Sequence, residues 1–342
     1  MKILITGGCG FVGSNIAIYL KKKLKKVKIS SLDNLMRKGS NLNRERLKKY
    51  KIHNYKIDIR NNNHLRKIPK FNLVIDCCAE PAIEASEKDP DRVLNTNLVG
   101  TFNILKKCIK DKSNIIFLSS SRVYSIKKLR DQVNNLNLNK PIKSLKKVNE
   151  SFETSSASSL YGFTKLASEK LIKEMFFQRK LKFIINRFGV IAGPWQFGKQ
   201  DQGFVTLWLA RHILKKKLSY IGFGGNGNQI RDILHIDDVC KIILLQMKKL
   251  NSIYDNTFNI GGGPNNALSL KMLTSKCQKL TNNTINIGKV AATSKFDIPM
   301  FVTDNNKISK VYKWRPKKNI NHILNDIFIW LKSNKKVLGY FK

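Results

Sequence analysis

The sequence lacks a long hydrophobic segment. None of its apolar runs approaches the roughly 18 residues that a membrane-spanning helix needs. The first run, Ile3–Ile5, is short and ends at a glycine-rich turn, unlike the longer apolar core of a secretory signal peptide. We therefore expect a protein that does not engage a membrane and that works in the cytoplasm.

Acidic residues are scarce. Asp and Glu number 23 against 64 Lys and Arg, which gives a formal net charge of +41. Such a charge permits nucleic-acid binding through the release of counterions from phosphates. However, the basic residues are scattered, as in Lys21–Lys23 and Lys215–Lys217, and no arginine-rich tail, zinc-finger spacing or RNA-binding aromatic motif accompanies them. The pattern favours lysines at solvent-facing positions and an anionic small-molecule substrate over a nucleic-acid partner.

The cysteines form no metal-binding pattern. The chain has six of them: Cys9, Cys77, Cys78, Cys108, Cys240 and Cys277. Their spacing is not that of metal ligands, so no metal site is predicted. Free buried thiols in a reducing compartment account for them, and a redox role for the adjacent pair Cys77–Cys78 is the alternative.

What is present is an alternation of short apolar runs with longer amphipathic stretches. Stretches such as Ser14–Lys26 and Arg92–Lys110 have helical character and separate the apolar runs. This alternation predicts an α/β fold with a doubly wound parallel sheet, covered by helices on both faces. The predicted strands are Lys2–Thr6, Val27–Leu32, Tyr55–Ile59, Leu73–Cys77 and Ile115–Leu118.

The regular alternation of predicted strands and helices ends in the second half of the chain, after Gly193-Pro194. Because 342 residues exceed the usual size of a single core, we expect a large domain over residues 1–190. Its core should also receive a segment near residues 230–260, and residues 191–342 should mainly form a smaller C-terminal α/β lobe. The later elements are predicted as a strand at Phe183–Arg187 and helices at Tyr161–Arg179, Gly203–Lys216 and Asn319–Ser333.

The turn Gly7–Gly13 follows the first predicted strand and precedes a helix. Gly7 permits the tight turn, Gly10 lets a pyrophosphate approach the backbone, and Gly13 lets the helix pack closely on the strand. The helix then offers free N–H groups and a positive dipole end to the phosphates. This arrangement predicts a dinucleotide-binding Rossmann fold.

An acidic residue, Asp33, ends the second predicted strand. A carboxylate at this point accepts hydrogen bonds from the adenosine ribose and repels a 2′-phosphate, so NAD is favoured over NADP. The nearby cations Arg37 and Lys38 leave NADP as the alternative. Asp58, at the end of the third predicted strand, is placed to reach the adenine edge.

Tyr161 and Lys165 are four residues apart at the start of a predicted helix, so they share one face. Hydride transfer from a hydroxyl-bearing carbon needs a base for the hydroxyl proton, and an adjacent ammonium lowers the pKa of a tyrosine toward that task. Ser120, in the run Ser119–Ser121 after the fifth predicted strand, lies where a hydroxyl can meet a ligand in the cleft. The three residues predict a redox site.

These motifs resemble the extended short-chain dehydrogenase/reductase family, which includes nucleotide-sugar epimerases and dehydratases. The resemblance covers nearly the whole chain. It rests first on the glycine turn, Asp33, the triple serine followed by Val123-Tyr124, and the Tyr161/Lys165 spacing. In addition, Asn95–Thr101 is similar to the family's helix beneath the cofactor. Gln229–His235 is similar to the family's segment that carries a diphosphate-binding arginine.

Within the family, four stretches resemble the branch of CDP-paratose 2-epimerases, also called CDP-tyvelose epimerases: Asp33–Gly39, Trp195–Phe197, Asp201–Gly203 and Phe258–Gly262. Aligned on Val123-Tyr124, the family's catalytic hydroxyl falls on Ser120 rather than Ser121. Dehydratases typically carry Thr-Asp-Glu there, whereas this chain has Ser120-Ser121-Arg122. The resemblance therefore implies epimerisation or simple redox chemistry rather than loss of water.

The resemblance also implies where ligands bind. Ser120, Tyr161 and Lys165 would be catalytic. The implied NAD site consists of Gly7, Gly10, Phe11, Val12, Gly13, Asp33, Asn34, Asp58, Ile59, Cys78, Ala79, Asn97, Tyr161, Lys165 and Val190. The implied substrate contacts are Glu80, Ser121, Arg122, Gln196, Gln202 and Arg231.

The activity implied is oxidation at C2 of a CDP-linked sugar with Tyr161 as base, turnover of the ketosugar and return of the hydride to its other face. Arg231 would anchor the diphosphate, and Gln196 and Gln202 would orient the sugar. The alternatives are a UDP-sugar 4-epimerase, an NAD(P)-dependent nucleotide-sugar reductase and a non-enzymatic, basic nucleic-acid-binding protein on a Rossmann scaffold.

A homodimer is also implied, because helices near Arg92–Lys110 and Tyr161–Arg179 match the family's usual four-helix contact. The apolar residues of these helices suit a core or an interface equally well. They are Leu98, Phe102, Leu105, Leu171 and Phe176.

Overall fold

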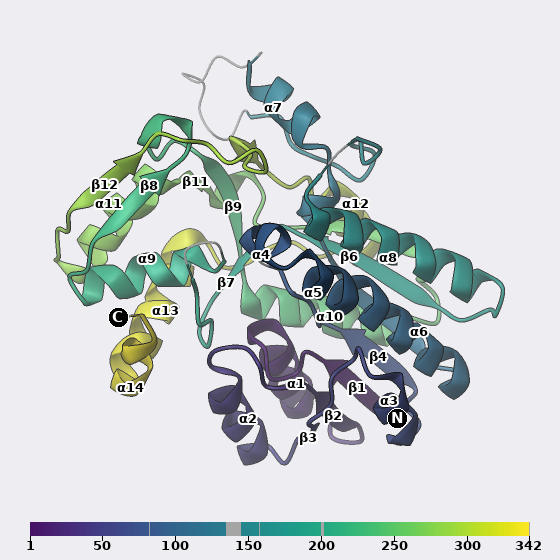
Figure 1. Ribbon diagram of the computed structural model, residues 1–342. Helices are drawn as coiled ribbons and strands as arrows, with labels where there is room; N and C mark the ends of the chain where they lie inside the picture. Colours follow the sequence, from purple (N-terminus) through teal and green to yellow (C-terminus); the bar gives the residue numbers. More distant parts are fainter. Residues whose placement is uncertain (82, 135–144, 157, 200–201, 342) are drawn as a thin grey trace. The chain divides into compact units, whose positions relative to one another are not determined.

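A computed structural model describes residues 1–81, 83–134, 145–156, 158–199 and 202–341 (Figure 1). The chain folds into two compact units. The first unit comprises Met1–Val123, Ser159–Arg187 and Val239–Phe258, and the second comprises Tyr124–Ser158, Phe188–Asp238 and Asn259–Lys342. Val239–Phe258 thus joins the first unit, and residues 124–158 belong to the second.

A 7-stranded sheet forms the centre of the first unit, with strand order β10-β6-β5-β4-β1-β2-β3. The pairs β1–β2, β1–β4, β2–β3 and β4–β5 are all parallel. The order reverses between β1 and β4, and the carboxyl ends of strands at such a switch point are where open α/β sheets bind ligands. The strands are β1 (Lys2–Thr6), β2 (Lys28–Leu32), β3 (His53–Tyr55), β4 (Leu73–Asp76), β5 (Asn114–Ser120), β6 (Phe183–Phe188) and β10 (Asn256–Ile260). The predicted Rossmann sheet is confirmed.

Helices connect these strands. They are α1 (Phe11–Lys23), α2 (Ser40–Lys49), α3 (Asn62–Lys67), α4 (Ile83–Lys88), α5 (Pro90–Leu94), α6 (Gly100–Asp111), α8 (Leu160–Phe177) and α10 (Ile236–Lys249), with a π-helical turn at Asn95–Val99 between α5 and α6.

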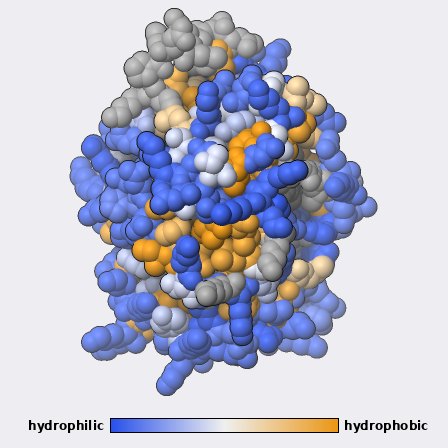
Figure 2. All heavy atoms as spheres, turned by 90° about the vertical axis from the view of Figure 1, so that its left-hand side faces the viewer, coloured by the Kyte–Doolittle hydropathy of each residue, from blue (hydrophilic) through white to orange (hydrophobic). Residues whose placement is uncertain are grey.

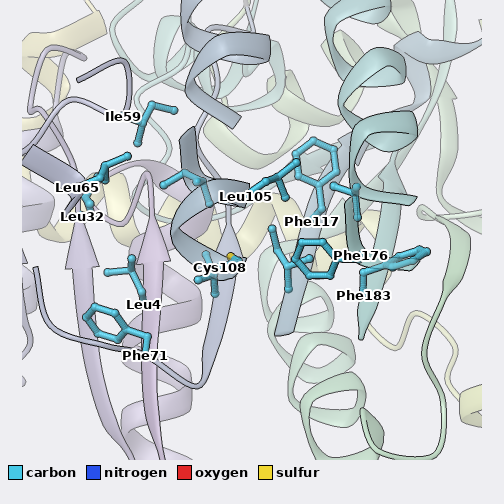
Figure 3. Close-up of a cluster of buried hydrophobic side chains, with 14 of the residues drawn as sticks. Leu4, Leu32, Ile59, Leu65, Phe71, Leu105, Cys108, Phe117, Phe176 and Phe183 are labelled. Atoms are coloured by element: carbon cyan, nitrogen blue, oxygen red, sulfur yellow. The ribbon is translucent and has the colours of Figure 1, made fainter. Parts of the chain in front are cut away.

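One face of the sheet packs against α3, α6 and α8 (Figure 3). Strand residues such as Leu4 and Phe117 meet Leu105 from α6 and Phe176 from α8. All four side chains are fully buried. The ambiguity about Leu105 and Phe176 is thus resolved, because both belong to the core, whereas Phe102 on α6 is 39% exposed.

The third strand lies earlier than the sequence predicts. It spans His53–Tyr55, whereas the apolar run led us to expect Tyr55–Ile59. After Tyr55 the backbone makes local bonds in place of sheet bonds: the N–H of Ile57 donates to the Tyr55 carbonyl at 3.0 Å, and Asp58 accepts from the main chain and guanidinium of Arg60. Ile59 remains buried through its side chain, which explains why its apolar character misled the strand prediction.

The second unit contains a 4-stranded sheet of order β11-β9-β13, with β7 paired to β9, and a 2-stranded sheet, β12-β8. Its strands are β7 (Val190–Ala192), β8 (Leu218–Ile221), β9 (Ile230–His235), β11 (Ala267–Ser269), β12 (Ile287–Val290) and β13 (Met300–Phe301). Its helices are α7 (Ile126–Asn134), α9 (Phe204–Ile213), α11 (Leu270–Thr281), α12 (Asn306–Tyr312), α13 (Ile320–Ser333) and α14 (Lys335–Leu338).

Hydrophilic residues cover most of the face seen in Figure 2, as the abundance of lysine leads one to expect. Among the residues that the structure describes, no helix is long and apolar enough to cross a bilayer.

Candidate active site

The glycine turn has the shape of a phosphate cradle. Gly7 has a φ of +59°, which an L side chain rarely adopts. A Cβ on Gly13 would lie 2.8 Å from Gly8 Cα and still closer to the carbonyl oxygen of Gly7, so only glycine lets α1 start this close to β1. Among the described residues, no side chain caps the amino end of α1. Its first-turn N–H groups, at half-buried Phe11 and Val12, therefore suit the pyrophosphate of a dinucleotide.

Asp33 follows β2 beside this turn. One carboxylate oxygen accepts from the N–H of Cys9 at 3.0 Å, and the other accepts from the N–H of Leu35 at 2.8 Å. Burial raises the pKa of Asp33, while these two hydrogen bonds and the charge of Arg37 lower it. The N–H of Gly10 donates to the carboxylate as well, and the three amides hold it in place beside the turn, where it is suited to accept from a ribose hydroxyl.

Asp58 is linked to the residue that follows Asp33: the side-chain amide of Asn34 donates to Asp58 Oδ2 at 3.0 Å. Hydrogen bonds from Arg60 lower the pKa of Asp58 to about 2. Asp58 and Arg60 also line an open depression of about 430 Å³. Asn34 and Asp58, both predicted as cofactor contacts, are thus in contact with each other, whereas Ile59 is buried against Gly100.

The structure brings Ser120 and Tyr161 into hydrogen-bonding contact. Ser120 ends β5, and Tyr161 lies in the first turn of α8, which Ser159 caps by accepting from the N–H of Gly162 at 3.1 Å. Burial raises the pKa of Tyr161; the hydrogen bond from Ser120 and the charges of Arg122 and Arg37 oppose this, and Glu80 adds to it. Ser121 and Arg122 follow in a half-buried 3-10 turn.

Lys165, one turn along α8, is buried. Its ammonium lies 4.1 Å from the centroid of the Phe117 ring. Burial lowers the pKa of Lys165, and the nearby charges, Asp76 foremost, raise it again. Asp76 is not among the residues predicted from the sequence; its one signal there is that a charged residue closes an otherwise apolar strand.

Glu80 follows β4 and is attached to the catalytic helix through Asn97. The Asn97 side chain accepts from the N–H of Glu80 at 2.7 Å and donates to the Glu80 carbonyl at 3.0 Å and to Thr164 Oγ1 at 3.2 Å. The Glu80 carboxylate contacts Arg92 and, at 3.5 Å, Arg37. Asn97, predicted as a cofactor contact, thus fixes the loop that also carries the half-buried Cys78 and Ala79.

The remaining predicted contacts lie in the second unit. Arg231 donates to Asp297 Oδ1 at 3.0 Å and to the Ile298 carbonyl at 2.7 Å. Gln196 accepts from Thr206 at 2.8 Å and donates to the Ile191 carbonyl at 3.0 Å, so both ends of its amide are engaged. Gln202 is half-buried, and Val190 begins β7. Asp201, one of the residues in the resemblance, lies outside the described residues.

A further polar cluster occurs in the second unit. His235, Asp237 and Asp326 have potential ligand atoms within 4.8 Å of one another. The ammonium of Lys318 contacts Asp326 and lies 3.2 Å from Asp237, so the chain supplies its own cation there. None of the six cysteines, all of which the structure describes, forms a disulfide.

Comparison with known proteins identifies the family of the chain. The model of the family described as "NAD dependent epimerase/dehydratase family" matches residues 3–261. CDP-paratose 2-epimerase of Salmonella typhi is 29% identical over 97% of this chain and 100% of its own length. A dTDP-D-glucose 4,6-dehydratase of Dictyostelium discoideum is 31% identical over 76% of this chain and 58% of its own length.

Solved structures share the fold. UDP-glucose 4-epimerase of Thermotoga maritima, solved with UDP-glucose, superposes with a TM-score of 0.82 at 23% identity, over 98% of this chain and 100% of that one. UDP-glucuronic acid 4-epimerase of Bacillus cereus, in complex with UDP-glucuronic acid and NAD, gives 0.81 at 22% identity, over 97% and 99% of the two chains.

Proposed function

The chain belongs to the NAD dependent epimerase/dehydratase family, and from this premise we propose that it epimerises one carbon of a nucleotide-diphosphate sugar. It is an NAD-dependent enzyme of nucleotide-sugar metabolism. The proposed reaction inverts C2 of a CDP-linked sugar of the paratose and tyvelose type. We assign NAD binding and catalysis mainly to the first unit, and nucleotide-sugar binding mainly to the second.

One observation carries the proposal: Ser120 contacts Tyr161 in the first unit, and Ser121-Arg122 follows where a dehydratase has the Asp-Glu pair that eliminates water. A guanidinium stays protonated at physiological pH and cannot donate its proton to a leaving hydroxyl group. Arg122 therefore supports reversible oxidation of a sugar carbon rather than elimination of water.

The residues that would hold NAD are the glycine turn with Phe11 and Val12, and Asp33 with the Asn34/Asp58 pair; these groups fit a dinucleotide. When bound, NAD accepts a hydride from a sugar carbon and returns it. Tyr161 Oη takes the proton of the hydroxyl on that carbon and later gives it back. Ser120 orients this hydroxyl. The ammonium of Lys165 stabilises the phenolate of Tyr161, and Arg122 and Arg37 add positive charge.

The substrate would be held from the second unit. Arg231 already binds a carboxylate, that of Asp297, and a guanidinium that pairs with one oxyanion is suited to exchange it for a diphosphate. Gln202 is proposed to contact the sugar, whereas Gln196 would first have to release Thr206 or Ile191. In the first unit, Glu80 is proposed to face the sugar while Arg92 and Arg37 hold its carboxylate.

A UDP-sugar 4-epimerase is the second candidate. A relative named UDP-glucuronate 4-epimerase, from Thermodesulfobacterium geofontis, is 26% identical over 99% of this chain and 98% of its own length. Net reduction of a nucleotide sugar would use the same residues but would consume NADH. Binding to nucleic acid would instead appear as steeply salt-dependent retention on DNA without turnover of any nucleotide sugar.

The test is incubation of the purified protein with CDP- and UDP-linked sugars in deuterated buffer, followed by NMR and mass spectrometry. Inversion at one carbon without uptake of deuterium is the expected result. Replacing Tyr161 by Phe should lower turnover by a factor on the order of 10² to 10⁴, because the base is lost, and should leave NAD bound.

Tyr312→Phe is the matched control, because Tyr312 is a buried tyrosine of the second unit and its loss should leave turnover unchanged. Full activity in Tyr161→Phe would contradict the assignment of the base, and deuterium next to a carbonyl would indicate enolisation instead of hydride return.

We also propose a homodimer in the cytoplasm. Exposed apolar side chains lie on α6 and α8, which pack side by side. They are Phe102, 39% exposed, with Phe163 and Phe177 on α8, 53% and 82% exposed, and Val99 in the preceding turn. Two such helix pairs would bury these rings together. The free cysteines support a reducing compartment.

A further inference from the structure

A fully buried carboxylate at the end of β4 takes no part in the mechanism above. We propose that Asp76 is a positioning residue of the reaction: its unpaired oxygen is the counter-ion that keeps Lys165 an ammonium ion at the buried carboxyl end of β4. The inference rests on the proposed role of Lys165 in the redox reaction, and one of its tests needs no turnover.

Strand register places the two groups together. In the parallel pairing of β4 with β5, Asp76 lies opposite Phe117. Neighbours in a sheet project from the same face, so the Asp76 carboxylate lies beside the Phe117 ring. The Lys165 ammonium lies over that ring, 4.1 Å from its centroid. The carboxylate and the ammonium therefore lie beside the same buried ring.

One oxygen of Asp76 is fixed and the other is available. Oδ1 accepts from the hydroxyl of Thr6, which lies opposite Asp76 in β1, and from the N–H of Cys78 at 3.2 Å. Oδ2 is buried and has no hydrogen-bond partner among the residues that the structure describes. A buried carboxylate oxygen without a partner is costly, unless a nearby charge compensates it. Lys165 is that charge.

The other carboxylate near Lys165 is already neutralised. Glu169, one turn further along α8, accepts from Arg187 at 2.7 Å and from Ser119 at 2.5 Å. The other titratable groups whose charge acts on Lys165 are the thiols of Cys77 and Cys78. Burial raises the pKa of both thiols well above its ordinary value, so they are neutral. Asp76 is thus the counter-ion left for Lys165.

Burial and charge act against each other in this pair. Burial raises the pKa of Asp76 and lowers that of Lys165, so on its own it disfavours the charged form of each group. Each charge moves the partner's pKa back toward its ordinary value. Tyr161 needs a charged lysine beside it to act as a base, so Asp76 would affect catalysis without touching the substrate.

The first test compares the pH dependence of kcat/KM between the unaltered protein and the Asp76→Asn variant. The substrate is the nucleotide sugar that the protein turns over in the incubation with CDP- and UDP-linked sugars. Asparagine keeps the bond from Thr6 but removes the charge, so Lys165 should lose its proton at lower pH. We expect the alkaline limb of the profile to move down by roughly one to three pH units. Turnover near pH 9 should fall at least about tenfold, which corresponds to one unit.

Asp111→Asn is the matched control. Asp111 also pairs with a buried lysine, Lys107, at 2.5 Å, and accepts from the N–H of Phe71 just before β4 begins. It therefore lies at the amino end of the strand that Asp76 closes. Its loss should destabilise the fold but leave both limbs of the profile unchanged. Equal profiles for the two variants and the unaltered protein would overturn the proposal.

The second test measures unfolding at a series of alkaline pH values and needs no substrate. In Asp76→Asn the folded-state pKa of Lys165 falls further below its unfolded value, so the unfolded chain binds more protons over a wider pH range. The stability deficit of the variant should therefore shrink as the pH rises through the interval between the two folded-state pKa values. A purely structural role predicts a deficit that does not vary with pH.

A double-mutant cycle separates the pair from its surroundings. In the Lys165→Met background, Asp76→Asn removes a carboxylate that has lost its counter-ion, so it should cost little or even stabilise. The same loss of stability in both backgrounds would overturn the proposal. If no nucleotide sugar is turned over by the unaltered protein, the proposed function fails, yet the cycle still decides whether Asp76 and Lys165 are paired.

Discussion

Gly13 shows how a single residue can decide cofactor binding. A methyl group at this position would meet the carbonyl oxygen of Gly7 and the Cα of Gly8, which are backbone atoms that cannot rotate away. Gly13→Ala should therefore push α1 from β1 and disturb the phosphate cradle. Overpacking of this kind costs about 1 to 3 kcal/mol, and we expect NAD affinity to fall by roughly 10- to 100-fold.

Isothermal titration of the purified protein with NAD measures the effect. Gly339→Ala is the control, because nothing lies within 4 Å of a Cβ added there. Its affinity for NAD should equal that of the unaltered protein. Unchanged affinity in Gly13→Ala would mean that the turn is not the pyrophosphate site.

At the level of elements, a π-helical turn at Asn95–Val99 connects the loop after β4 to α8. Asn97 in this turn makes its three hydrogen bonds to Glu80 and Thr164, and Thr164 donates to the carbonyl of Tyr161 at 2.8 Å. Asn97→Ala leaves buried partners unsatisfied, so we expect a loss of about 1 to 3 kcal/mol in the free energy of unfolding. It should also lower kcat more than NAD affinity, since Tyr161 loses its support.

Urea unfolding and steady-state kinetics test this prediction. The control is Asn186→Ala, which breaks a reciprocal amide pair with Gln246 elsewhere in the first unit, at 2.8 and 2.7 Å. That variant should lose comparable stability and keep its kcat. Equal effects of the two substitutions on kcat would indicate that Asn97 acts on stability alone.

At the level of the whole molecule, the net charge of +41 opposes the proposed dimer. Two such chains repel each other, and added salt screens this repulsion. The dimer should therefore tighten as ionic strength rises from about 0.01 to 0.15 M, where the Debye length falls from about 30 to 8 Å. Sedimentation at increasing salt concentration measures this trend. A dimer held together by opposite charges would instead weaken as the salt concentration rises.

The double substitution Phe163→Glu and Phe177→Glu should give a monomer at all these salt concentrations. Ile329→Glu is the control, because Ile329 is an apolar residue, 54% exposed, on α13 of the second unit and is not part of α6 or α8. A dimer that persists in the first variant and is lost in the second would move the interface to the second unit.

The sequence by itself determined the features that depend on near neighbours along the chain. The alternation of apolar runs set the Rossmann sheet, because strands covered on both faces must be apolar throughout. The glycine turn and Asp33 indicated NAD through local turn chemistry, and the four-residue spacing of Tyr161 and Lys165 placed both on one helical face. The family assignment follows from the same residues.

Only the tertiary structure decided which polar groups meet. The counter-ion of Lys165, the contact of Ser120 with Tyr161, and the attachment of Glu80 to α8 join residues from strands and helices far apart in sequence. These contacts depend on strand register and helix packing, and a shift of one residue would turn each side chain to the opposite face. The end of β3 was mispredicted because the backbone makes local bonds from Ile57 onward, although the side chain of Ile59 is still buried.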